Sequence, residues 1–176
     1  MKKIVSLLLL VFFTFSSCEK DDICDANTST TPRLVIQFYD ITNQTQLKNV
    51  TNLKVIGDGK TEGIVFNQSA TGEAKYLANG STISIPLKTD VNTTKYSFIL
   101  NSGSDSSNED EIKFEYTREN SYVSRACGFK TIFTFDSSIP IIHTSVPSTK
   151  SKWMQNISVE KSNIVNENET HVKIYF

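Results

Sequence analysis

Apolar and polar residues alternate along most of the chain from residue 33 onward. Residues 33–40 place Leu34, Ile36 and Phe38 on one face. Residues 111–116 alternate in the same way, with charged residues at 111, 113 and 115 and with Ile112, Phe114 and Tyr116 on the other face. A period of two is typical of a β-strand with one buried face. No window of a dozen residues after the N-terminal stretch keeps helical spacing, so the pattern predicts an all-β protein with little helix.

The alternating segments are short and separated by turn residues. This arrangement predicts an antiparallel β-sandwich of about nine short strands. The segments expected to form strands are residues 33–40, 53–56, 64–66, 73–78, 81–87, 95–100, 111–116, 122–125, 129–135, 153–159 and 171–176.

Three local signals refine this expectation. Asn79-Gly80 lies between two of the segments and predicts a hairpin, because a type I′ turn needs positive φ at both central positions. Pro86 cannot donate to a sheet ladder, so the strand that carries Ile83, Ile85 and Leu87 is expected at an edge or to end there. Residues 139–147 are apolar but contain two prolines, which predicts an edge strand or a loop.

The N-terminal stretch predicts export. Lys2 and Lys3 precede residues 4–13, which are apolar except for Ser6. This run is shorter than the roughly 20 residues that span a bilayer. Residues 1–17 therefore read as a signal peptide. Phe15-Ser16-Ser17-Cys18 resembles the lipobox of bacterial lipoproteins and predicts lipidation at Cys18. Ordinary secretion is the alternative, although Phe15 is large for cleavage by the ordinary signal peptidase.

The residues after Cys18 predict where the lipoprotein resides. Glu19, Lys20, Asp21 and Asp22 resemble the export signal of Bacteroidota surface lipoproteins, so we expect an outer-membrane protein on the cell surface. The periplasmic leaflet is the alternative, in which these residues are a charged tether. Residues 18–32 then form a lipidated N-terminal tether, and residues 33–176 have the length of a single all-β domain.

Charge narrows the range of partners. The formal net charge is −1, and the basic residues are scattered along the sequence. This composition offers no electrostatic footprint for nucleic acid or for anionic lipid. The expected membrane contact is the N-terminal lipid, and a protein or a glycan remains as a possible further partner.

The chain has three cysteines. If lipid occupies Cys18, Cys24 and Cys127 remain as an even pair in an oxidising compartment and are expected to form a disulfide. Such a bond would connect the N-terminal arm to the middle of the fold. Two free thiols are the alternative, and a metal site has few nearby ligands to support it.

Four segments resemble a known family: Cys24, residues 31–40, residues 125–130 and the closing residues 166–176. They are similar to an uncharacterised lipoprotein family of the Bacteroidota, domain of unknown function 6452. The resemblance implies a lipid-anchored envelope protein and supports the pairing of Cys24 with Cys127. It brings no known activity, so it implies no catalytic residue.

No motif predicts catalysis, a metal or a cofactor. The two histidines, His143 and His171, lack a nucleophile motif and are expected at the surface or the rim of the domain. The acidic residues 105–111 do not fit a calcium-binding loop and are expected at a solvated hairpin end. Most aromatic residues fall on the apolar faces, but Trp153, Tyr39 and Tyr122 are candidates for exposure.

These observations predict a lipid-anchored envelope protein that binds or scaffolds a partner at the outer membrane and is not an enzyme. The alternative is a hydrolase or a metal-dependent enzyme of a type that the sequence does not reveal. A polar cleft that holds a histidine beside a carboxylate would favour that alternative.

Overall fold

Eleven strands form two sheets in the part of the chain that the structure describes. The computed structural model describes residues 23–25, 28 and 30–176. Their internal contacts divide them into two units. Unit 1 holds the described residues up to Thr30 together with Ser121–Lys130, and unit 2 holds Thr31–Asn120 and Thr131–Phe176.

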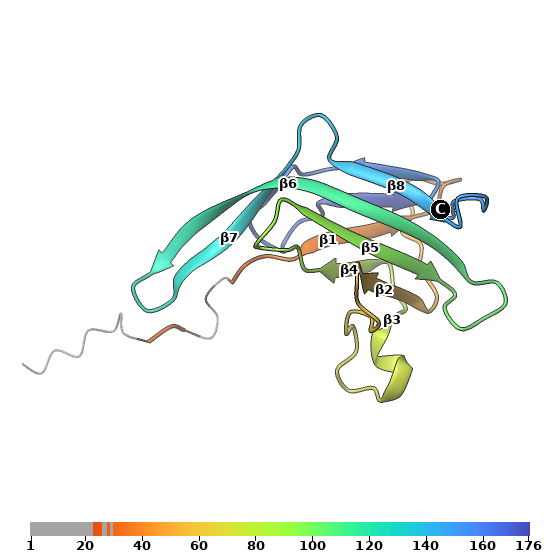
Figure 1. The fold of residues 1–176 in the computed structure, drawn as a ribbon, viewed down its shortest axis with the longest axis horizontal. Helices are drawn as coiled ribbons and strands as arrows, with labels where there is room; N and C mark the ends of the chain where they lie inside the picture. Colours follow the sequence, from red (N-terminus) through yellow and green to blue (C-terminus); the bar gives the residue numbers. More distant parts are fainter. Residues whose placement is uncertain (1–22, 26–27, 29) are drawn as a thin grey trace, which may run out of the picture. The chain divides into compact units, whose positions relative to one another are not determined.

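The smaller sheet joins the first strand of the chain to the last one. Its order is β4 (Thr82–Ile85), β1 (Leu34–Tyr39), β11 (Val172–Tyr175) and β9 (Asn156–Val159) (Figure 1). β1 and β11 are parallel, with Ile36 opposite Val172 and Phe38 opposite Ile174. A parallel pair needs a long crossover, and here the crossover contains most of the chain.

The larger sheet is built around one long strand. Its order is β10 (Asn163–Ile164), β7 (Gly128–Phe135), β6 (Asn108–Ser124), β5 (Thr93–Leu100), β2 (Leu53–Gly57) and β3 (Leu77–Ala78), and β8 (Ile141–Val146) also pairs with β6. β6 pairs with β5 along its first half and uses its opposite edge there for β8. It unites two segments, 111–116 and 122–125, that the sequence suggested as separate strands.

The two sheets pack together through their apolar faces, which confirms the predicted β-sandwich. Phe38 and Ile174 from the smaller sheet and Phe98 and Phe114 from the larger sheet are fully buried. Burial of each such side chain contributes about 1.5 to 3 kcal/mol relative to exposure. The period-2 pattern therefore predicted these core residues correctly.

The hairpin predicted at Asn79-Gly80 is wrong. β3 pairs with β2 and β4 pairs with β1, so the two strands that flank this dipeptide belong to different sheets. Neither residue has the positive φ of a type I′ turn. Instead, Asn79 Oδ1 accepts the backbone N–H of Asn52, and the carbonyl of Gly80 accepts that of Val50. Contacts distant in sequence thus override the local turn signal.

Residues 73–78 also differ from the expected strand. A 3₁₀-helix, η2 (Gly72–Tyr76), occupies most of this segment and leads directly into β3. The strand expected over residues 64–66 does not form either, although Gly63 makes an isolated bridge to Ile56. Tyr76 is nevertheless buried, so this segment packs its apolar side chain without extended backbone.

The proline signals are confirmed. β4 is the edge strand of the smaller sheet and ends at Ile85, directly before Pro86. β8 lies between Pro140 and Pro147 and pairs with β6 alone. Within the described residues, no helix has the length and apolar character needed to span a membrane.

Candidate functional site

The residues predicted to carry the lipid and the export signal lie outside the described residues. They are Cys18, Glu19, Lys20, Asp21 and Asp22. Lipidation and surface export therefore stay predictions.

The disulfide between Cys24 and Cys127 is present, as the sequence predicted. The two Cα atoms lie 4.9 Å apart and are separated by 103 positions in sequence. Cys127 lies in the turn between β6 and β7, where its N–H donates to Ser124 Oγ at 3.0 Å. Both cysteines belong to unit 1. Within unit 1, the bond therefore joins the N-terminal arm to the turn that follows β6.

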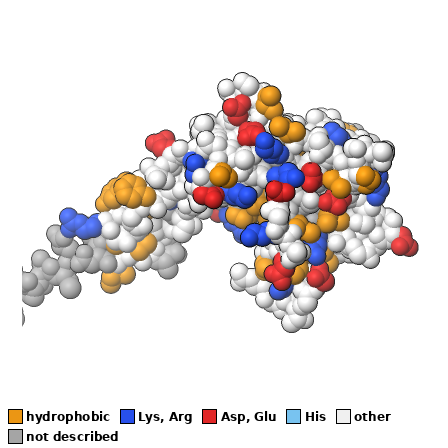
Figure 2. Space-filling view, in the orientation of Figure 1, with side chains coloured by type: hydrophobic (Ala, Val, Ile, Leu, Met, Phe, Trp, Pro, Cys, Tyr) orange, Lys and Arg blue, Asp and Glu red, His pale blue; other side chains and the backbone are white. Residues whose placement is uncertain are grey.

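Exposed apolar side chains surround this disulfide in unit 1. Tyr122 and Phe129 are 62% and 68% exposed, and their rings meet edge to face with centroids 5.4 Å apart. Ile23, next to Cys24, is 83% exposed. Figure 2 shows hydrophobic side chains on the surface at this end of the β6–β7 hairpin. Tyr122 is exposed as suggested, whereas Phe129 was not among the aromatic residues suggested for exposure.

The other aromatic candidates for exposure are less accessible. Trp153 is buried, and its indole N–H donates to the carbonyl of Phe98 at 3.1 Å. Tyr39 is half-buried and stacks at a tilt on Tyr175. Neither residue presents an open aromatic face that could bind a glycan.

Asp110 and His143 form a hydrogen-bonded pair inside unit 2. Asp110 is completely buried, and His143 Nε2–H donates to Asp110 Oδ2 over 2.9 Å. The same oxygen accepts the backbone N–H of Met154, also at 2.9 Å, while Asp110 Oδ1 is buried without a hydrogen-bond partner. Ser145 stands directly opposite Asp110 on β8. No hydrogen bond joins Ser145 to His143 among the described residues, so a catalytic relay is not assembled here.

Asp110 does not lie at a solvated hairpin end, so the position predicted for it from the acidic pattern is wrong. The hairpin end between β5 and β6 covers residues 101–107, and Asp110 already lies on β6. The sequence did contain a signal for its burial, because Asp110 lies two positions before Ile112 and so continues the alternation of Ile112, Phe114 and Tyr116. Extension of the strand by one more alternation places its carboxylate on the buried face.

His171 is also buried, which corrects the expected surface position, whereas His143 is only partly exposed, as expected of a rim residue. His171 Nδ1 accepts the backbone N–H of Val35 at 3.0 Å. Because His171 directly precedes β11, this hydrogen bond connects the start of β11 to β1. Burial lowers the pKa of His171 below its ordinary value, and the nearby Glu169 carboxylate opposes this effect. The neutral ring is therefore the form that the fold holds.

A groove of about 550 Å³ runs beside the edge strand β4. Its floor and walls come from β4, from β3 with the dipeptide that follows it, and from residues 65–67. Thr82 and Ser84 supply hydroxyl groups and Arg33 supplies a cation. Alternate backbone groups of an edge strand point away from its single neighbour and can pair with another extended segment.

A smaller hollow of about 300 Å³ lies where β2 ends and β5 begins, and three lysines, Lys60, Lys88 and Lys95, are among the residues that line it. Lys95 already pairs with Asp58 at 3.0 Å and with Glu111 at 3.4 Å. The hydrogen bond from Lys95 to Asp58 raises the pKa of this lysine. Its charge is thus balanced within the protein, which makes this hollow a weaker anion site than the lysines alone indicate.

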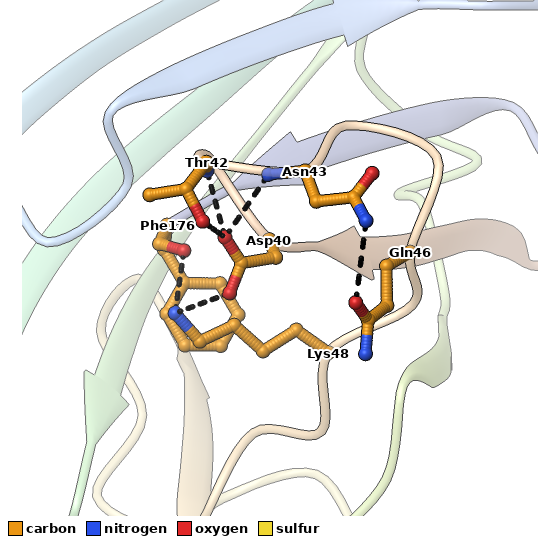
Figure 3. A network of polar contacts seen from close by, with 6 residues as sticks. All are labelled: Asp40, Thr42, Asn43, Gln46, Lys48 and Phe176. Atoms are coloured by element: carbon orange, nitrogen blue, oxygen red, sulfur yellow. Dashed lines mark hydrogen bonds and ion pairs between the residues drawn. The ribbon is translucent and has the colours of Figure 1, made fainter.

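A polar network connects the loop after β1 to the last residue (Figure 3). Asp40 Oδ1 accepts from the hydroxyl and the N–H of Thr42 and from the N–H of Asn43. Lys48 Nζ donates to the backbone oxygen of Phe176 at 2.7 Å and lies 4.4 Å from the centre of its ring. The Thr42 hydroxyl is the main reason that the pKa of Asp40 falls to about 2. These contacts occupy the carboxylate within its own loop.

The described residues contain no group of three or more His, Cys, Asp or Glu side chains placed to hold a metal ion.

Comparison with family models identifies the chain at family level. Residues 52–176 match the model described as a family of unknown function, DUF6452. The chain belongs to the DUF6452 family. Comparison with curated proteins finds no match, and comparison with solved structures finds none.

The DUF6452 match includes the Asp110–His143 pair, His171, Cys127 and most of the groove. It begins after β1, so Cys24 and residues 31–40 lie before the matched part of the chain. The larger sheet lies wholly within the match, whereas the smaller sheet takes one of its two central strands from outside it.

Proposed function

We propose that this DUF6452 protein is a Bacteroidota lipoprotein of the outer membrane, held by lipid on Cys18 and displayed at the cell surface. There it acts as a binding or scaffolding module and not as an enzyme. The partner that we assign to it is an extended segment of another protein, bound along the edge of β4.

The Cys24–Cys127 bond is the observation that supports this location best. Structural disulfides persist in oxidising compartments and are rare where thiols are kept reduced. Cys24 follows Cys18 by only six positions. The disulfide thus supports export for the same short segment that the lipobox resemblance marks for lipidation.

The groove supports the binding role. Its residues Thr82, Ile83 and Ser84 form most of an edge strand that has one neighbour in its sheet. A partner strand can use main-chain hydrogen bonds for affinity and side-chain pockets for specificity. Backbone pairing favours a protein segment over a glycan, because a glycan has no regular row of amide donors and acceptors.

Metabolic labelling and protease treatment test the anchor. An alkyne fatty acid should label the wild type and leave Cys18→Ala unlabelled. Protease added to intact cells should remove the wild type, and replacement of residues 19–22 by alanine should protect the protein. Equal labelling of both proteins contradicts lipidation, and an intact wild type beside a digested surface marker contradicts surface display.

Cross-linking in intact cells tests the groove. Thr82→Arg places a long cation in the groove from an exposed position, and Thr89→Arg adds the same side chain at an exposed position outside it. We expect a cross-linked partner with the wild type and Thr89→Arg but not with Thr82→Arg. A partner that all three proteins retain is bound elsewhere.

The Asp110–His143 pair favours one second candidate, a hydrolase that uses Ser145 as its nucleophile. In that case a fluorophosphonate probe should label the wild type and not Ser145→Ala. The binding role is preferred because no hydrogen bond joins Ser145 to His143 among the described residues, so the nucleophile lacks its base.

A further inference from the structure

The end of the β6–β7 hairpin carries an apolar cluster that the groove does not use. It consists of Ile23, Tyr122 and Phe129, which are all exposed and all belong to unit 1. The disulfide joins the two chain segments that supply them, because Cys24 follows Ile23 and Cys127 lies in the turn between the two aromatic residues.

We infer that this cluster is a membrane-contact surface, set into the interfacial layer of the bilayer that also holds the lipid on Cys18. The inference rests on the lipidation proposed above. It adds a second point of attachment to the membrane, made by the folded protein itself.

Chain length is the first argument for the bilayer. A trans backbone extends by at most about 3.6 Å per residue, so the six steps from Cys18 to Cys24 span no more than roughly 20 Å. The disulfide transfers this limit to Cys127 and to the turn around it. The hairpin end is therefore confined to within about the thickness of one leaflet and its headgroups from the lipid.

The chemistry of the cluster is the second argument. Tyrosine is enriched at membrane–water interfaces, where its ring meets the acyl boundary and its hydroxyl stays among the headgroups. Tyr122 and Phe129 meet edge to face, so together they present one aromatic wedge. Exposed apolar side chains at the end of a hairpin are costly in water, and burial at the interface removes that cost.

Fluorescence quenching by brominated lipid tests the inference. Tyr122→Trp places a reporter in the cluster, and Ile139→Trp places one at an exposed position of unit 2. Each full-length mature lipoprotein is reconstituted in phosphatidylethanolamine vesicles with a brominated phosphatidylcholine. The buried Trp153 also fluoresces, and the wild-type protein measures this background fluorescence. We expect quenching at position 122 to be severalfold stronger than at position 139.

A disulfide-free version tests the role of the bond. In Tyr122→Trp combined with Cys24→Ser and Cys127→Ser, the lipid still holds the protein on the vesicle but no longer confines the hairpin end. Quenching at position 122 should then fall severalfold. Unchanged quenching would overturn the argument from tether length.

The remaining outcomes separate this inference from the proposed function. An intact mass without lipid contradicts lipidation and removes the inference with it. A lipidated protein that floats with vesicles but shows equal quenching at both positions overturns only the membrane contact. In the last outcome, the emission of the tryptophan at position 122 shifts as more protein is reconstituted per vesicle, and brominated lipid does not quench it. This result would assign the cluster to contact with a second copy of the chain and would also overturn the membrane contact.

Discussion

His143 donates its Nε2–H to a completely buried carboxylate oxygen of Asp110 across 2.9 Å. The same oxygen accepts the N–H of Met154, which lies between β8 and β9. Asp110 stands on the larger sheet, and β9 belongs to the smaller one. This pair therefore fixes the segment that crosses from one sheet to the other.

Loss of the Asp110 carboxylate should destabilise the fold. Asp110→Ala leaves the N–H groups of Met154 and His143 without their acceptor, and an unsatisfied buried donor costs about 1 to 3 kcal/mol. Urea unfolding measures the change. The matched control is Glu111→Ala, which removes a neighbouring carboxylate from the partly exposed face and should cost less than about 1 kcal/mol. Equal losses for the two variants would contradict this role.

Stability should fall in mild acid because of His171. Burial lowers its folded pKa below the ordinary value of 6.5, so the unfolded chain binds a proton more readily than the folded one does. The stabilisation that neutral His171 gives to the folded state is complete above pH 6.5 and is lost as the pH falls through the folded pKa of this histidine. Protonation also removes the Nδ1 acceptor of Val35 N–H.

Thermal unfolding between pH 7 and 5 measures this dependence. The midpoint of the wild type should fall over that window, whereas His171→Gln should show a flatter profile. Asn168→Ala, an exposed change nearby, should keep the slope of the wild type. Parallel profiles for the wild type and His171→Gln would assign the acid sensitivity to another group.

The pKa of Asp40 should depend on Thr42 more than on Lys48. Thr42 supplies the two strongest contributions to the low value of about 2, and Lys48 supplies the weakest. Thr42→Ala should therefore raise the pKa toward 3.8, and Lys48→Ala should change it less. A carbon-detected NMR titration of the Asp40 carboxyl measures both. A larger shift in Lys48→Ala would show that charge, and not hydrogen bonding, controls this group.

Removal of the disulfide should lower the stability by the same amount whether one cysteine or both are replaced. Cys24→Ser and Cys127→Ser should each lower the free energy of unfolding by about 2 to 5 kcal/mol, because the bond closes a long loop in the unfolded chain. The double variant should lose the same amount as either single variant, since all three lack one bond. Chemical denaturation of the oxidised proteins checks this, and losses that add would mean that the cysteines act separately.

The sequence by itself determined which face of most strands is buried, where β4 ends and which cysteines pair. Alternation reports burial because successive side chains point to opposite faces of a sheet. Pro86 reports an edge because it has no N–H to donate. The cysteine pair followed from counting, once Cys18 was assigned to lipid.

Only the tertiary structure decided the parallel pairing of β1 with β11, the separation of β3 from β4 and the hydrogen-bond partners of Asp110 and His171. Partners that lie more than a hundred residues apart leave no periodic trace in either strand. At Asn79-Gly80, bonds to Asn52 and Val50 outweigh the local turn preference. A polar side chain can be buried only where distant groups supply its hydrogen bonds, as Met154 does for Asp110 and Val35 for His171.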